Sequence, residues 1–141
     1  ELKKFLSLLF TANINSEKPS ELIRLSMTRA RFCELVGMQL STKQEASMAF
    51  LTGMMSLIDA IMDQPVEELM EKLPLAQAIK DALVRQEGAI ASYLALIQCY
   101  ERADWESAQS IIKELNLDKN VVPEMYHQAV TWANEQADMS G

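Results

Sequence analysis

Few side chains in this 141-residue sequence are of the types that catalyse reactions or bind metals. There is one histidine, His127. A histidine-based metal site needs several ligands, so His127 is better interpreted as a surface or half-buried residue. Cys33 and Cys99 form no C-x-x-C motif and lie in apolar helical contexts, which predicts two buried free thiols. Free thiols are typical of a reducing compartment, so we expect a cytoplasmic protein.

Carboxylates are more numerous, and Asp59 and Asp63 are the two that could hold Mg²⁺ or Mn²⁺ in a divergent phosphohydrolase. Other acidic pairs, such as Glu67 and Glu68, are consecutive on a predicted helix and therefore do not face each other. The sequence contains no G-x-S-x-G elbow, no G-x-x-x-x-G-K-[ST] and no G-x-G-x-x-G. We therefore expect no complete active site, no catalytic residue, no metal site and no cofactor.

The elements that must position these side chains are predicted to be helices almost throughout. Glycine and proline number only four each, whereas residues that favour helices are frequent. Hydrophobic residues make up 49% and charged residues 23%, as in ordinary folded domains. We expect one compact all-α domain over residues 1–141, with about eight helices at 2–12, 20–40, 43–62, 65–72, 75–86, 89–102, 105–115 and 122–137.

Capping residues set several of these boundaries. Asp104 is placed as the N-cap of the helix that follows it, and Thr42 with Glu45 forms a T-x-x-E capping box. Gly88 is expected to end the 75–86 helix in the left-handed conformation.

The charge and hydropathy of the sequence restrict its partners. The net charge is −7, which disfavours nucleic acid, because affinity for a phosphate backbone depends on Lys and Arg. No apolar run reaches the roughly 18 residues that a membrane span needs. We therefore expect a protein partner, and neither nucleic acid nor membrane.

The 43–62 helix is predicted to lie at the centre of the core, because apolar residues cover most of its circumference. Asp59 lies on its narrow polar stripe, and a carboxylate on such a helix needs a partner. Arg29 falls in the middle of the apolar arc of the 20–40 helix. We therefore expect Arg29 and Asp59 to be partly buried and satisfied by each other or by backbone groups. Small residues form one face that a neighbouring helix could approach closely: Ala46, Ala49, Gly53 and Ala60.

The C-terminal part of the HDOD domain, the HD-related output domain, resembles three stretches of this sequence: RARFCELVG (29–37), AFLTGMMSLIDAIMDQPVEELMEKLPLAQAIKDAL (49–83) and YERADWE (100–106). The resemblance is to the version joined to EAL domains in bacterial cyclic-di-GMP signalling proteins, and it covers most of residues 1–106. It implies an HD-domain-like helical fold. It also implies that the chain is a fragment, with further helices and any EAL domain upstream of Glu1.

The resemblance also implies that the metal site of the related enzymes has been lost. HD phosphohydrolases bind metal through a His-Asp pair at the end of a helix, and the common HDOD pattern there is F-L-x-G-L-L-H-D-I-G. In FLTGMMSLID, Ser56 stands at the histidine position, Leu57 at the aspartate and Asp59 at the final glycine. Further histidines of the HD pattern would fall near Phe32 and near Arg85-Gln86, and neither place has one. The metal site is therefore expected to be absent.

These observations favour a non-catalytic regulatory domain that acts through protein contacts on a cyclic-di-GMP phosphodiesterase module of the EAL type. A surface patch at Tyr100, Arg102 and Trp105 could contribute to such contacts, although Trp105 next to a cap is more typical of a core anchor. A homodimer could form if truncation exposes an apolar face of the first helix. The alternatives are a stand-alone helical adaptor and a metal-dependent phosphohydrolase that uses Asp59 and Asp63.

Overall fold

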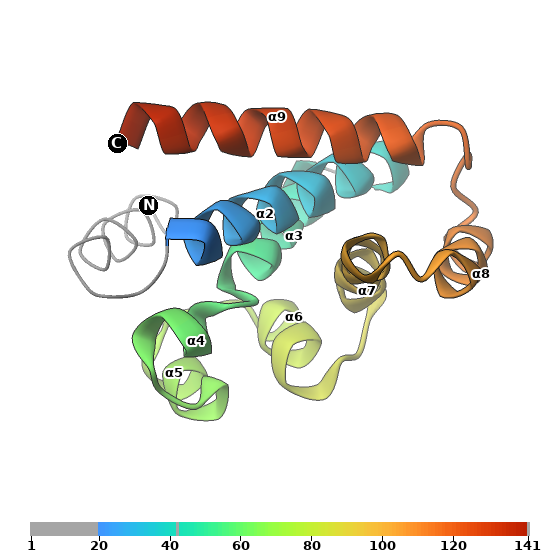
Figure 1. Cartoon of the computed structure of the whole chain (residues 1–141). Helices are drawn as coiled ribbons and strands as arrows, with labels where there is room; N and C mark the ends of the chain where they lie inside the picture. Colours follow the sequence, from blue (N-terminus) through green and yellow to red (C-terminus); the bar gives the residue numbers. More distant parts are fainter. Residues whose placement is uncertain (1–19, 42, 141) are drawn as a thin grey trace.

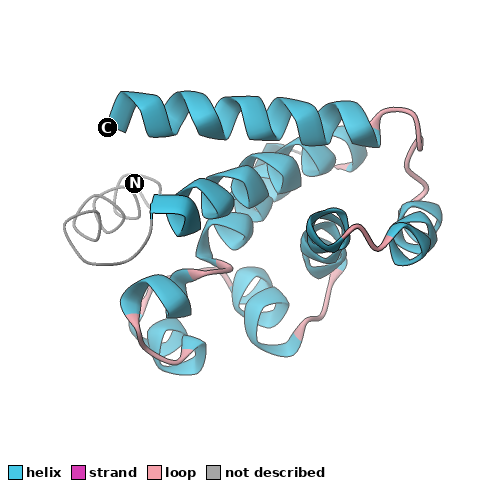
Figure 2. Ribbon diagram, in the orientation of Figure 1, coloured by secondary structure: helices cyan, strands magenta, loops and turns pink. Residues whose placement is uncertain are grey.

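The computed structural model describes residues 20–41 and 43–140, and every regular element in these ranges is a helix (Figures 1 and 2). The predicted all-α class is thus confirmed. The predicted 2–12 helix and Thr42 of the predicted capping box lie outside the described residues. The elements in chain order are α2 (Ser20–Leu40), α3 (Lys43–Met55), α4 (Ile58–Met62), α5 (Val66–Lys72), α6 (Gln77–Lys80), the π-helical turn η1 (Asp81–Arg85), α7 (Ala89–Arg102), α8 (Trp105–Leu115) and α9 (Val122–Ser140).

Helix α2 lies at the centre of the fold, in contact with α3, α7 and α9. Its most extensive contacts are with α3, and α9 runs along another of its sides. Figure 1 shows α7 nearly end-on, crossing beneath the α2–α3 pair, with α8 packed beside it. Helices α4 and α5 lie at the opposite end of the view from α8. No helix among the described residues is both long and apolar enough to cross a membrane.

The buried residues form two clusters that share α2 and α3. One cluster joins Phe32 and Val36 of α2 to α7, α8 and α9. The other joins Met54 and Met55 of α3 to α4, α5 and α6. Because α2 and α3 contribute to both clusters, any change in how these two helices pack reaches both halves of the core.

The contact between α2 and α3 is close because small residues line it. Ala46 and Ala49 are buried, and a Cβ atom built on Gly53 would lie 2.5 Å from the backbone oxygen of Arg29. The predicted small-residue face is thus confirmed for these three positions. Ala60, its fourth member, belongs instead to α4.

The predicted 43–62 helix is wrong as one element, because the chain leaves the helical path at Ser56 and Leu57. The Ser56 Oγ donates a hydrogen bond to the Gly53 carbonyl at 2.7 Å, and the Ser56 backbone N–H donates to the same oxygen at 3.3 Å. Serine often competes in this way with the helical ladder. Leu57 then has φ −116° and ψ 13°, and α4 starts in a new direction.

Three further boundaries can be compared with expectation. The predicted 75–86 helix is replaced by the short α6 and η1, and Gln86, not Gly88, is the left-handed residue that ends it, with φ 58°. Asp104 is confirmed as an N-cap, since its carboxylate accepts a hydrogen bond from the Ser107 backbone N–H at 3.2 Å. Helix α9 continues to Ser140, beyond the predicted end at 137.

Candidate functional site

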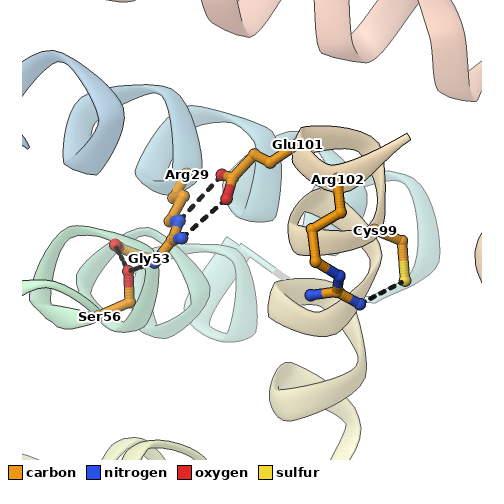
Figure 3. A network of polar contacts seen from close by, with 6 residues as sticks. All are labelled: Arg29, Gly53, Ser56, Cys99, Glu101 and Arg102. Carbon is orange, nitrogen blue, oxygen red and sulfur yellow. Dashed lines mark hydrogen bonds and ion pairs between the residues drawn. The ribbon is translucent and has the colours of Figure 1, made fainter. Parts of the chain in front are cut away.

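The break between α3 and α4 places Ser56 beside a charged network that joins three helices (Figure 3). Arg29 of α2 donates from Nε to Glu101 Oε2 at 2.9 Å and from Nη2 to Glu101 Oε1 at 2.7 Å. Its Nη1 donates to the Ser56 Oγ at 3.1 Å. Glu101 lies near the end of α7. We refer to Arg29, Ser56 and Glu101 as the arginine network.

The arginine network is well suited to fix helices in place. A guanidinium holds a carboxylate through two parallel charge-assisted hydrogen bonds, which are among the strongest in proteins. The Arg29 and Glu101 side chains are only 10% and 19% exposed, so water weakens this pair less than it weakens a surface pair. The network therefore ties α7 to both α2 and the end of α3.

The predicted pairing of Arg29 with Asp59 is wrong. Arg29 is buried as expected, but its carboxylate partner is Glu101. Asp59 is exposed, and its Oδ1 accepts a hydrogen bond from the Ala60 backbone N–H at 2.9 Å, which is the backbone alternative. The prediction assumed one continuous helix, and the break at Ser56 turns Asp59 away from α2.

The Ser56 hydroxyl uses its proton and one acceptor position for hydrogen bonds within the chain. It donates to the Gly53 carbonyl and accepts from Arg29. A catalytic serine needs an adjacent base to take its proton, but the charged group that contacts Ser56 is a guanidinium, which has only donor atoms. His127, the chain's one histidine, is exposed on α9. The geometry at Ser56 therefore favours a structural role.

A cavity of about 340 Å³ opens beside Ser56, between η1 and α7. Its polar lining is uncharged and consists of hydroxyl and amide side chains: Ser56, Gln86, Ser92 and Gln98. Ser56 and Gln86 are two of the places where the HD resemblance expects metal ligands, and the fold does bring them to one cavity. Leu57 is half-buried and packs against the α3–α6 cluster, while Phe32 lies fully in the core.

These residues do not fit a metal ion. A hydroxyl and an amide are weak replacements for imidazole and carboxylate. The Arg29 guanidinium contacts Ser56 and would repel a cation placed there. Among the described residues, no three His, Cys, Asp or Glu side chains are grouped so that they could hold a metal.

Both predicted thiols are buried and free. Cys33 is fully inaccessible beside the arginine network, and this burial raises the pKa of its thiol well above the usual range, against the opposing effect of Arg29. Burial likewise raises the pKa of Cys99, whose Sγ lies 3.7 Å from Nη2 of Arg102. Because the thiolate is the reactive form, both thiols should be inert in the folded chain.

Brief labelling with N-ethylmaleimide should therefore give no adduct with the native chain and two adducts in concentrated guanidinium chloride, as read by mass spectrometry. The Cys99→Ala variant leaves Cys33 as the sole thiol, so that any native adduct can be assigned. Labelling of Cys33 in that variant as fast as an exposed thiol would contradict its burial in the core.

Two of the three residues of the predicted surface patch, Arg102 and Trp105, are exposed, and Tyr100 is half-buried. Trp105 is 54% exposed, so its interpretation as a core anchor is wrong. Its ring packs at right angles against Tyr100, with centroids 5.0 Å apart, and Tyr100 in turn contacts Tyr126 at 5.2 Å. Arg102 is exposed, but its Nη2 is directed to Cys99 and lies 3.8 Å from Oδ2 of Asp104. Whether these residues contact a protein remains a prediction.

Two curated proteins are similar to the chain over nearly all of its length. The cyclic di-GMP phosphodiesterase CdgJ of Vibrio cholerae is 38% identical over 135 residues, which cover 96% of this chain and 31% of CdgJ. The uncharacterized protein YuxH of Bacillus subtilis is 30% identical over 141 residues, which cover 98% of this chain and 34% of YuxH. The chain thus spans about a third of each relative's length. No family model and no solved structure matches it.

Proposed function

We propose that this chain is a non-catalytic regulatory domain of the HDOD type, which acts through protein contacts on a cyclic-di-GMP phosphodiesterase module. The observation that carries the proposal is its similarity to CdgJ. Almost the whole chain aligns with a third of a protein named as a phosphodiesterase, which leaves two thirds of that protein for the catalytic part. A region that makes up only part of a larger signalling protein is what the resemblance to EAL–HDOD proteins implies.

The chemistry around Ser56 supports a non-catalytic role. The positions at which an HD enzyme would hold a metal carry a committed hydroxyl, a packed leucine and a neighbouring guanidinium. Asp59 and Asp63, the carboxylates of the phosphohydrolase alternative, are both exposed on or next to the five-residue α4. Neither lies in a water-excluded cleft of the kind that strengthens electrostatic catalysis.

Regulation would act through helix packing. The arginine network ties α7 to α2 and α3, and these two helices contribute to both core clusters. A contact that shifts α7 relative to α2 would therefore be transmitted to the far cluster. An attached module that binds one arrangement more tightly than the other would be biased by this shift.

The proposal is tested by assaying the purified chain with cyclic-di-GMP and a generic phosphomonoester in the presence of Mg²⁺ or Mn²⁺, with metal analysis of the same sample. We expect no turnover above the blank and no stoichiometric transition metal. Turnover that disappears in an Asp59→Asn/Asp63→Asn variant would establish the phosphohydrolase alternative instead.

The regulatory part is tested by a chimera in which this chain replaces the homologous region of CdgJ. We expect the chimera to hydrolyse cyclic-di-GMP at a rate different from that of CdgJ with the region deleted. Equal rates would contradict regulation of such a module and favour the stand-alone adaptor. Reading the gene upstream of Glu1 distinguishes the same two cases, because the proposal expects an EAL-type coding sequence there.

A further inference from the structure

A cavity beside α8 lies away from the arginine network. Its volume of about 600 Å³ falls within the range of small-molecule sites. One face of α8 forms a wall with Trp105, Gln109 and Lys113, at the spacing of successive helical turns. The α8–α9 connection adds Lys119 and Asn120, and Tyr100 of α7 closes the aromatic end.

Buried side chains and local hydrogen bonds hold the lining of this cavity in place. Ala108, Ile112 and Leu117 are buried and form part of its lining. The connection is held by local hydrogen bonds, since Asp118 accepts from the Asn120 backbone N–H at 2.9 Å and Leu117 donates to the Ile112 carbonyl at 3.0 Å. A site with such a frame is largely pre-formed.

The charge of the cavity is opposite to that of the protein. The chain has 20 acidic and 13 basic residues, yet no described carboxylate lines this cavity, and two lysines do. Neither Lys113 nor Lys119 forms an ion pair with a described carboxylate. Two unpaired ammonium groups at one cavity would attract an anion, because ammonium groups are common ligands of phosphate.

We propose that this cavity binds a phosphorylated nucleoside, with its base against Trp105 and its phosphate at Lys113 and Lys119. An indole that is more than half exposed offers ring surface for stacking a base. Gln109 and Asn120 supply amides, which have both donor and acceptor atoms for the edge of a base. A simple anion would use the lysines but would leave the aromatic wall and the amides without a role.

The direct test titrates the chain with guanosine monophosphate and follows the fluorescence of Trp105. The other tryptophan, Trp132, packs against Phe50 with ring centroids 5.9 Å apart, and a Trp132→Phe variant removes its signal. We expect saturable quenching by guanosine monophosphate, binding of guanosine at least about tenfold weaker, and no quenching by inorganic phosphate. Isothermal titration calorimetry of the unaltered chain gives the same comparison if the variant folds poorly.

Two double variants with the same change in net charge locate the site. Lys113→Ala/Lys119→Ala should raise the Kd for guanosine monophosphate by about tenfold or more, because two charge-assisted contacts are lost. Lys43→Ala/Lys72→Ala removes two exposed lysines on α3 and α5 and should leave the Kd unchanged. Trp105→Ala, measured by calorimetry, should weaken binding by a similar factor.

The proposal is overturned if guanosine monophosphate gives no saturable signal by either method. It is also overturned if guanosine binds as tightly as its monophosphate, or if both lysine variants weaken binding equally, since the effect would then be one of net charge. These outcomes do not depend on whether the chain regulates a phosphodiesterase.

Discussion

Replacing Gly53 with alanine is expected to lower the free energy of unfolding by about 3 kcal/mol, the upper end of the usual range for overpacking. The new Cβ would lie 2.5 Å and 2.6 Å from the backbone oxygen and carbon of Arg29 and 2.7 Å from the Cα of Ala30. These are backbone atoms and cannot rotate away. Helices α2 and α3 would have to separate, which would loosen both core clusters and displace Arg29 from Ser56.

Urea unfolding followed by far-ultraviolet circular dichroism measures this loss. The matched control is Gly37→Ala on the same α2–α3 contact, where the new Cβ would lie 2.9 Å from the Cα of Ala46 but no closer than 3.4 Å to other atoms. Only one backbone atom lies under 3.0 Å there, against three at Gly53, so Gly37→Ala should also lower the free energy of unfolding but by less than Gly53→Ala. Equal stabilities of the two variants would show that α2 and α3 are not in close contact at Gly53.

The parts of the fold that depend on local patterns could be predicted from the sequence. The buried circumference of α3, its small-residue face and the Asp104 cap each follow from a few neighbouring residues, and the structure confirms them. Burial of Cys33 and Cys99 follows in the same way from apolar helical surroundings. The all-α class was also accessible, because helix formers are frequent and breakers are few.

The break at Ser56 and its consequences were not accessible from periodicity. Leu57 and Ile58 continue the apolar pattern of α3, so the pattern alone favours one long helix. The deciding contacts are the hydrogen bonds from Ser56 to Gly53, whose geometry depends on how α3 packs on α2. Gln86 likewise adopts a left-handed conformation that glycine usually occupies, although Gly88 is close by.

The partner of Arg29 was missed because it is distant in sequence. Glu101 follows Arg29 by 72 residues, and no periodicity connects a charge on α2 with one on α7. The burial of Arg29 in an apolar arc was a usable signal that some carboxylate must approach it. The error at Trp105 is the reverse: its place next to the Asp104 cap favoured burial, but the side chain is 54% exposed and lines a cavity.

Arg29→Met is expected to lower the free energy of unfolding by about 3 kcal/mol, the lower end of the range for breaking a buried ion pair. Methionine fills a similar volume but leaves the Glu101 carboxylate, only 19% exposed, without its bidentate partner, and leaves Ser56 without its donor. The matched control is Arg31→Met on the same helix. Arg31 pairs with Glu34 one turn away and is 32% exposed, so its loss should change stability by less than about 1 kcal/mol.

A double-mutant cycle separates the penalty of an unpaired charge from the value of the pair itself. In Arg29→Met/Glu101→Leu both charges are gone, and well-packed apolar replacements of a buried ion pair are often neutral. We therefore expect the double variant to recover most of the stability that Arg29→Met loses, in the same urea experiment. Additive losses in the cycle would show that the two side chains are not coupled.

A double variant that is stable also gives the sharpest test of regulation, because it keeps the fold but removes the polar tie between α7 and α2. Introduced into the CdgJ chimera, it should change the rate of cyclic-di-GMP hydrolysis if that tie transmits the signal, whereas an unchanged rate would assign the arginine network to stability alone.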